Sequence, residues 1–231
     1  ELPDQYDISS IAHLLEVDAD QLAQAVANHA KKYFTQPLVV REFIPHDQAL
    51  DLMTQFKTMP GIHVEAQAAR DYLYPELYAH ILGYLGRISP DDLAIGLSSD
   101  YDLSDHIGKT GLELTYEDAL RGRKGSVIKE VTAGGQILDV IAEEQAVPGY
   151  NVVLSIDTTL QQLLYDAIQK EVDSRGLPGA SAIALDPRTG EIRALVSYPS
   201  YDPNAFIQGI DQASYTNLVE DSRKPLFNRA I

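Results

Sequence analysis

Apolar residues recur at helical spacing in the first part of the chain and predict four short helices. Two fall within 8–34, where Asp7 and Asp18 precede the apolar positions and can cap the helix starts. A third helix is expected at 49–59, where a Pro-Gly pair follows it, and a fourth at 77–85. This part of the chain is therefore predicted to be mainly helical.

Extended segments are predicted where the apolar residues form short runs or alternate with polar ones. Strands are expected at 37–43 and at 151–156. Residues 126–132 and 136–142 flank a Gly-Gly pair, which favours a β-hairpin.

The clearest helix is predicted at 158–176, where Thr158 and Gln161 have the spacing of a capping box. Two apolar runs within 181–198 flank a turn and predict a second hairpin. We expect the helix to pack on this hairpin, so the fold class of the chain is predicted to be α+β.

A Pro-Gly pair at 148–149 marks the predicted domain boundary, giving domains at 1–150 and 151–231. The first would be an irregular domain of short helices and β-hairpins. The second begins with one helix and one hairpin, and no third strand is predicted before Ile231. We therefore expect the second domain to be only partly contained in these residues.

Composition excludes several classes of function. The formal net charge of −16 would repel a phosphate backbone, so nucleic-acid binding is not expected. The absence of cysteine removes disulfides, thiolate zinc sites and cysteine nucleophiles. No apolar run approaches the ~20 residues of a membrane-spanning helix. Residue 1 is Glu rather than Met, and we interpret the sequence as part of a longer protein.

Two short sequence motifs of serine acyl-transfer enzymes occur in this chain, but their order and their secondary-structure context differ from those of the enzymes. Lys109-Thr110-Gly111 spells KTG, and Ser126 to Lys129 spells SxxK. In that chemistry the SxxK serine opens a helix and KTG lies on a later strand. Here KTG comes first and Ser126 begins a strand-like run, so neither is expected to be catalytic.

Scattered polar and aromatic residues favour structural roles. The histidines occur singly, at His13, His29, His46, His63, His80 and His106. None has the spacing of a metal-ligand pair, and no cofactor is expected. Tyrosines cluster at Tyr72, Tyr74, Tyr78 and Tyr84. A core or interface role is favoured for this cluster over a binding platform.

The run from 108 to 125 carries the most specific motif of the chain. Leu112, Tyr116 and Leu120 fall on one face of a predicted helix. The fixed positions are Gly108, Gly111, Leu112, Glu113, Tyr116, Leu120, Arg121, Gly122 and Gly125. This spacing resembles a signature of the non-catalytic N-terminal domain of class B penicillin-binding proteins, the membrane-anchored D,D-transpeptidases that cross-link peptidoglycan.

Further segments resemble the same family, over nearly all of 61–231. They are Leu154–Asp157 with Leu160–Gln161, Ala184–Gly190, Ser200–Asn204 and Pro225–Ala230. The first is similar to the start of the transpeptidase domain and the last to the lead-in to its catalytic helix. In the family the SxxK serine follows shortly, so the resemblance implies a nucleophile beyond Ile231. Residues 206–209 and 215–218 are more similar to the elongation branch than to the division branch.

The resemblance implies a function divided between this chain and the rest of a longer protein. The chain would be the pedestal domain plus the first part of the transpeptidase domain, and inactive alone. The longer protein would act on peptidoglycan stem peptides and bind penicillin at the periplasmic face of the cytoplasmic membrane. A polytopic glycan polymerase of the elongation machinery would be its partner.

Structural or interdomain roles, rather than catalytic ones, are implied for ten residues. They are Arg70, His80, Gly108, Gly111, Glu113, Tyr116, Arg121, Gly122, Asp186 and Gly190. The glycines are expected to allow the 108–125 helix to pack closely on 70–84, and Glu113 to pair with Arg70. The spacing from Arg70 to the next proline is longer than in the family, which leaves the role of Arg70 open.

Two other classes compete with this interpretation. A stand-alone extracytoplasmic scaffold that regulates a glycan polymerase would have to tolerate an open sheet edge in 151–231. A hydrolase using Ser126 and Lys129 would need a helical SxxK, which the pattern does not support.

Overall fold

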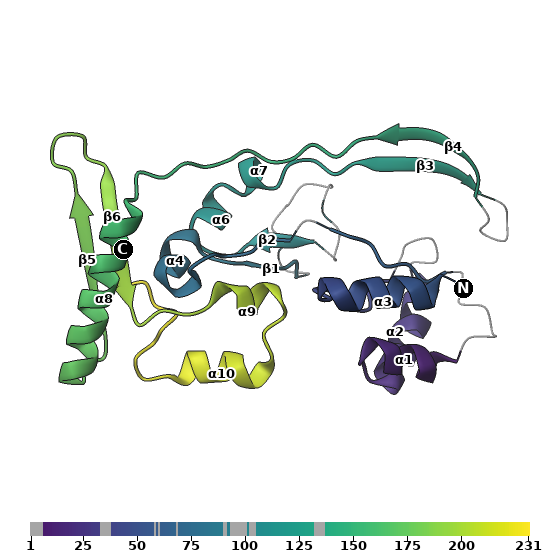
Figure 1. The fold of residues 1–231 in the computed structure, drawn as a ribbon, viewed down its shortest axis with the longest axis horizontal. Coiled ribbons are helices and arrows are strands. Elements are labelled where there is room, and N and C mark those ends of the chain that lie inside the picture. Colours follow the sequence, from purple (N-terminus) through teal and green to yellow (C-terminus); the bar gives the residue numbers. More distant parts are fainter. Residues whose placement is uncertain are drawn as a thin grey trace. The chain divides into compact units, whose positions relative to one another are not determined.

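The computed structural model describes residues 7–32, 38–57, 59, 61–67, 69–89, 92, 101, 105–131 and 137–231. The chain forms two compact units, Glu1–Ala69 and Arg70–Ile231. Helices build the described part of the first unit, and helices with small antiparallel hairpins build the second, so the α+β class is confirmed (Figure 1). Among these helices, none has the length and apolar character needed to cross a membrane.

Three helices pack together in the first unit: α1 (Ile8–Leu15), α2 (Ala19–Lys32) and α3 (His46–Phe56). The predicted caps are confirmed. Asp7 accepts a hydrogen bond from Ser9 N at 3.0 Å, and Asp18 accepts one from Gln21 N at 2.8 Å. The buried core consists of Ile11, Ala12, Leu15, Leu22, Leu52 and Phe56.

The strand predicted at 37–43 is wrong for its described part, residues 38–43, which are irregular. A strand needs a neighbour to satisfy its backbone groups, and the described part of this unit offers none. The segment is instead fixed by Arg41, which donates to Leu15 O at 2.7 Å and pairs with Glu16 at 3.1 Å.

The second unit contains three two-stranded antiparallel sheets among its described residues. Their strands are β1 (Leu85–Arg87) with β2 (His106–Gly108), β3 (Ser126–Val131) with β4 (Ile137–Glu144), and β5 (Ala180–Leu185) with β6 (Ile192–Tyr198). Its helices are α4 (Pro75–Leu82), α6 (Gly111–Thr115), α7 (Glu117–Leu120), α8 (Thr158–Arg175), α9 (Pro203–Ile207) and α10 (Gln212–Glu220). This unit includes both sides of the domain boundary predicted near residue 149, so residues from both sides pack together here.

Helix α8 packs on the β5–β6 hairpin, as the sequence predicted. It ends at Gly176, whose φ of 62° is left-handed. The predicted capping box is wrong, because the N-cap is Asp157, whose side chain accepts from Leu160 N at 3.0 Å. Gln161 is completely buried, so its side chain is not available at the helix start.

The structure confirms one further predicted element and contradicts another. The β3–β4 hairpin is confirmed, and its connection at 132–136 lies outside the described residues. The strand predicted at 151–156 is wrong, because these residues are irregular. The end of the segment approaches the β5–β6 hairpin: Ser155 Oγ donates to Ile192 O, and Asp157 N, just after the segment, donates to Arg193 O.

The helix predicted within 108–125 is broken into α6 and α7 at Tyr116, whose φ is −111°. Tyr116, which was expected on one helix face with Leu112 and Leu120, is 45% exposed. The break accompanies a turn of Glu117 toward β2, where its carboxylate accepts hydrogen bonds from Gly108 N at 2.8 Å and from Tyr101 Oη at 3.1 Å. These two bonds connect α7 to β2 and to Tyr101.

Candidate interdomain junction

Residues 70–84, here called the junction segment, lie at the centre of the second unit. They contain α4, which contacts α6 from the region that follows it in the chain and α8, α9 and β6 from the C-terminal region (Figure 1). Each of these elements is separated from α4 by other elements of the chain. The junction segment therefore contacts elements on both sides of the boundary predicted near residue 149.

An ion pair joins the start of the junction segment to α6, as expected from the family resemblance. Arg70 Nε lies 2.8 Å from Glu113 Oε1, and Arg70 Nη2 donates to Glu113 Oε2 at 3.2 Å. This two-point geometry is the strong form of an arginine–carboxylate pair. Glu113 is only 5% exposed, so the pair satisfies a buried carboxylate.

Tyr72 completes this arrangement. Its hydroxyl donates to Glu113 Oε1 at 3.2 Å and accepts from Leu85 N at 3.1 Å. Burial, reinforced by the negative charge of Glu113, raises the pKa of the Tyr72 phenol. The hydroxyl therefore stays protonated and can keep donating to the carboxylate.

Glycines allow the backbone of the junction segment to touch the loop before α6. A Cβ on Gly83 would lie 1.9 Å from Thr110 O, and one on Gly111 would lie 2.6 Å from Gly83 N. Gly111 also has a φ of +62°, which favours glycine. The expected close packing of 108–125 on 70–84 is thus present at Gly111.

Asn204, at the start of α9, holds the junction segment from the other side. Its Oδ1 accepts from Tyr72 N at 2.9 Å, and its Nδ2 donates to Tyr72 O at 3.1 Å. Asn204 is itself fixed by Asp202, whose carboxylate accepts from Asn204 N at 2.8 Å. One side chain thus satisfies both backbone groups of Tyr72.

Gln161 makes a second bridge, inside the core. Its Nε2 donates to Leu77 O at 3.0 Å and to Leu195 O at 2.8 Å, and its Oε1 accepts from Leu195 N at 2.8 Å. The side chain therefore joins α8 to α4 and to β6 at once. Because it is fully buried, each of these bonds replaces a lost bond to water.

The C-terminal segment reaches the end of α4. Asn228 Nδ2 donates to His80 O at 3.1 Å, and Tyr201 Oη donates to Ala79 O at 3.4 Å. The His80 ring stands edge-on to Tyr201 at 5.3 Å, with Nε2 3.4 Å from Pro199 O. Burial lowers the pKa of His80 below its ordinary value. A neutral ring at this position donates one hydrogen bond without bringing a charge into the core.

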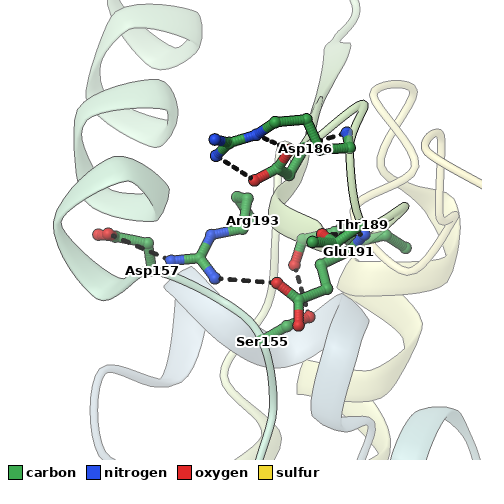
Figure 2. A network of polar contacts seen from close by, with 8 residues as sticks. Ser155, Asp157, Asp186, Thr189, Glu191 and Arg193 are labelled. Atoms are coloured by element: carbon green, nitrogen blue, oxygen red, sulfur yellow. Dashed lines mark hydrogen bonds and ion pairs between the residues drawn. The ribbon is translucent and has the colours of Figure 1, made fainter.

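A more exposed network surrounds the β5–β6 turn. Figure 2 shows Arg193 between Glu191, at 3.4 Å, and Asp157, at 4.0 Å. Asp186 accepts from Arg188 N at 2.9 Å, and hydrogen bonds from the Arg188 side chain and backbone lower the pKa of its carboxyl. These exposed pairs shape the turn and contribute little net stability.

The remaining expected residues lie around α7 and the turn. Arg121 stacks on the Tyr101 ring with Cζ 4.0 Å from the centroid. A Cβ on Gly122 would lie 2.3 Å from Val147 O. Gly190 has a φ of +77° and closes the β5–β6 turn by donating to Asp186 O at 2.8 Å. Arg121, Gly122 and Gly190 thus determine the conformation of the loops in which they lie. None of these contacts involves residues of the junction segment.

The residues of the KTG and SxxK motifs have structural positions in the fold. Lys109 pairs with Asp92 at 2.5 Å, and hydrogen bonds from Lys109 and Ser89 lower the pKa of the Asp92 carboxyl to about 2. Ser126 begins the exposed hairpin strand β3. In the part of the chain that the structure describes, no three His, Asp or Glu side chains come close enough together to hold a metal ion.

The bridging role of three residues was not predicted from the sequence: Gln161, which was expected in a capping box, Asn204 and Asn228. Each lies in a segment that resembles the penicillin-binding family, so the resemblance marked their neighbourhoods. Their partners are backbone groups 84, 132 and 148 residues away, which no local pattern can indicate.

Comparisons with known proteins agree with the resemblance. Residues 3–154 match the family described as the Penicillin-binding Protein dimerisation domain. The chain is 40% identical over 175 residues to the peptidoglycan D,D-transpeptidase MrdA of Acinetobacter baumannii, covering 74% of this chain and 25% of that protein. It is 30% identical over 230 residues to MrdA of Escherichia coli, covering 98% of this chain and 35% of that protein.

A solved structure shows the same fold. It is the complex between penicillin-binding protein PBP2 and MreC from Helicobacter pylori, with a TM-score of 0.74 and 26% identity over 99% of this chain. The match covers 43% of that chain. The sequence described above thus spans less than half the length of each of these relatives.

Proposed function

This chain belongs to the penicillin-binding protein dimerisation family, in the elongation-type branch of class B, and on that premise we propose that it supports and orients a D,D-transpeptidase domain. The acylating serine of that domain would lie in sequence outside these 231 residues. It would attack a stem-peptide carbonyl and then pass the acyl group to the amine of a neighbouring peptide.

The observation that supports this proposal is the set of hydrogen bonds that hold the backbone of the junction segment. Its backbone is held by Asn204 at Tyr72, by Gln161 at Leu77 and by Asn228 at His80. A support that transmits orientation needs several fixed points rather than one flexible link. Three side-chain amides bond to the backbone at separate places between residues 72 and 80, and so they provide several fixed points.

The ion pair of Arg70 and Glu113 would fix the pedestal side of the same segment. The carboxylate is bound at two points by the guanidinium and once by Tyr72. A rotation of α6 relative to the junction segment would break all three bonds together. We propose that this coupling keeps the pedestal and the transpeptidase domain in one orientation.

The proposed setting is the periplasmic face of the cytoplasmic membrane, reached through an anchor outside this sequence. A polytopic glycan polymerase of the elongation machinery is the proposed partner, and peptidoglycan stem peptides are the substrates of the longer protein. The related PBP2 that was solved together with MreC supports a partner-binding role for such a pedestal.

A labelling experiment tests the enzymatic part of the proposal. A fluorescent penicillin should modify the longer protein covalently and leave residues 1–231 unlabelled. Labelling of the 231-residue chain alone would contradict the proposal, as would a longer protein that stays unlabelled under conditions where another penicillin-binding protein reacts.

A charge reversal tests the orienting part. Glu113→Lys in the longer protein places two cations together, and we expect it to lower cross-linking activity in the presence of the polymerase. Glu191→Lys on the exposed β5–β6 turn is the matched control. Equal activity and equal stability of the two variants would remove the orienting role of Glu113.

A further inference from the structure

Arg229 has an unusual set of partners for an arginine. Its Nη1 donates to Lys224 O at 3.2 Å and to Phe227 O at 3.1 Å, and its Nη2 donates to Arg223 O. The guanidinium also lies over the Phe227 ring, 5.7 Å from its centroid. The charged group thus binds three backbone carbonyls of one loop, 223–227, that folds around it.

The backbone of Arg229 is fixed as well. Arg229 N donates to Ser197 Oγ at 3.1 Å, and Ser181 Oγ donates to Arg229 O at 2.9 Å. Ser181 on β5 and Ser197 on β6 are direct partners in the hairpin register. Two serines facing each other across the hairpin therefore hold both backbone groups of one residue.

A glycine makes room for this side chain. A Cβ on Gly179 would lie 2.6 Å from Arg229 Nε and 2.5 Å from Tyr198 O. Any side chain there would have to displace either the guanidinium or the backbone of the hairpin. The position of Gly179 just before β5 and that of Arg229 are therefore interdependent.

The neighbouring residues connect this arrangement to the junction segment. Asn228 donates to His80 O at 3.1 Å and accepts from Ala230 N at 2.9 Å. Arg229 thus lies where the loop 223–227, the β5–β6 hairpin and the end of α4 meet. A change in its rotamer would release the loop from all three carbonyl contacts.

We propose that Arg229 is a positioning residue that fixes the path of residues 223–230 across the β5–β6 hairpin and, through that path, the placement of the acylating serine. The second half of this statement rests on the proposed function. The planar fork of an arginine suits several carbonyls in fixed directions, whereas the single ammonium of a lysine cannot reproduce that geometry. Arg229 itself is not expected to touch the substrate.

The acylation rate of the longer protein tests the proposal. In this step the serine oxygen bonds to the lactam carbonyl carbon, the lactam C–N bond opens, and the hydroxyl proton ends on the nitrogen. We expect Arg229→Lys to lower the maximal acylation rate constant about tenfold or more, because misplacement by a fraction of an ångström is costly in such reactions. The penicillin concentration at half-maximal rate should change little.

Two further variants separate positioning from folding. Gly179→Ala keeps the arginine in the sequence but puts a methyl group 2.6 Å from its Nε and 2.5 Å from Tyr198 O, so the guanidinium is displaced and the same loss of rate is expected. Arg188→Ala removes an arginine that is 86% exposed and should leave the rate unchanged. All rates are normalised to the folded fraction, measured by circular dichroism.

The outcomes distinguish this inference from the function on which it rests. If folded Arg229→Lys and Gly179→Ala are acylated as fast as the unaltered protein, the positioning role is wrong. A loss explained entirely by a smaller folded fraction overturns it as well. If the unaltered longer protein does not react with penicillin, the proposed function fails instead.

Discussion

The side-chain amide of Asn204 closes a pair of hydrogen bonds with the backbone of Tyr72, which lies 132 residues earlier in the chain. The amide accepts from the N–H at 2.9 Å and donates to the carbonyl at 3.1 Å. This is the pattern of a strand pair, made here by one side chain. It satisfies the backbone N–H and carbonyl of a residue in an irregular segment, as a neighbouring strand would do in a sheet.

Asn204→Ala should loosen the junction segment at this point. Both backbone groups of Tyr72 lose their partner, and we expect a loss of about 2–3 kcal/mol in the free energy of local opening. Hydrogen exchange of the Tyr72 amide measures this directly. Asn217→Ala on exposed α10 is the control and should leave that exchange rate unchanged. Equal exchange in both variants would show that Asn204 does not secure the segment.

Gln161→Leu should destabilise the second unit strongly, although leucine fits the volume. The change leaves Leu77 O and both backbone groups of Leu195 buried without their partner, which we expect to cost about 3–5 kcal/mol. Urea unfolding followed by circular dichroism gives the value. The matched control is Gln162→Leu, one residue away on the exposed face of α8, which should cost less than about 0.5 kcal/mol.

Gly111→Ala and Gly190→Ala should differ, although both glycines have positive φ. At Gly111 the new methyl would lie 2.7 Å from Leu82 C and 2.6 Å from Gly83 N, whereas at Gly190 it would meet open space. We expect about 3 kcal/mol or more for Gly111, from the backbone clash, and about 1 kcal/mol for Gly190, from backbone strain alone. Thermal unfolding ranks the two variants. Similar melting temperatures would contradict the close contact.

Mild acid should weaken the second unit through His80. Its pKa is lowered from 6.5 in the folded chain, so the unfolded chain binds the proton first as the pH falls. Above pH 6.5 both states are neutral and the residue contributes no pH dependence. Below it, stability falls until the pH reaches the folded-state pKa of His80.

A variant without the imidazole isolates this effect. The difference in urea midpoint between about pH 7.5 and about pH 5.5 should be smaller for His80→Gln than for the unaltered chain. His13→Gln, at an exposed position of α1, should keep the full difference. An undiminished difference in His80→Gln would assign the pH dependence to other groups.

Local chemistry explains which elements could be predicted from the sequence. Asp7 and Asp18 cap their helices because a carboxylate two or three residues before a free N–H reaches it without tertiary help. Gly176 ends α8 because glycine adopts the left-handed conformation at little cost. The ion pair of Glu113 and Arg70 was expected only through the family resemblance, since 43 residues separate them.

The errors arose where a neighbour decides the conformation. Residues 38–43 and 151–156 have strand-like composition but pair with no strand among the described residues, so they stay irregular. The helix predicted within 108–125 is interrupted at Tyr116, next to Glu117, whose carboxylate bonds to Gly108 N on β2. At α8 the spacing favoured Thr158 as the cap, but the buried bonds of Gln161 leave Asp157 in that role.

By itself the sequence determined the helices with strong caps, both long hairpins, the α+β class and, through its motifs, the family. Those properties depend on residues a few positions apart, whose encounter costs little chain entropy. Only the tertiary structure decided that Gln161, Asn204 and Asn228 form hydrogen bonds to the backbone of the junction segment. The same holds for the hydrogen bonds of Arg229 to the carbonyls of the preceding loop. A side-chain amide or guanidinium can bond to any backbone group, so its partner is set by which distant backbone the folded core brings within 3 Å or so of it.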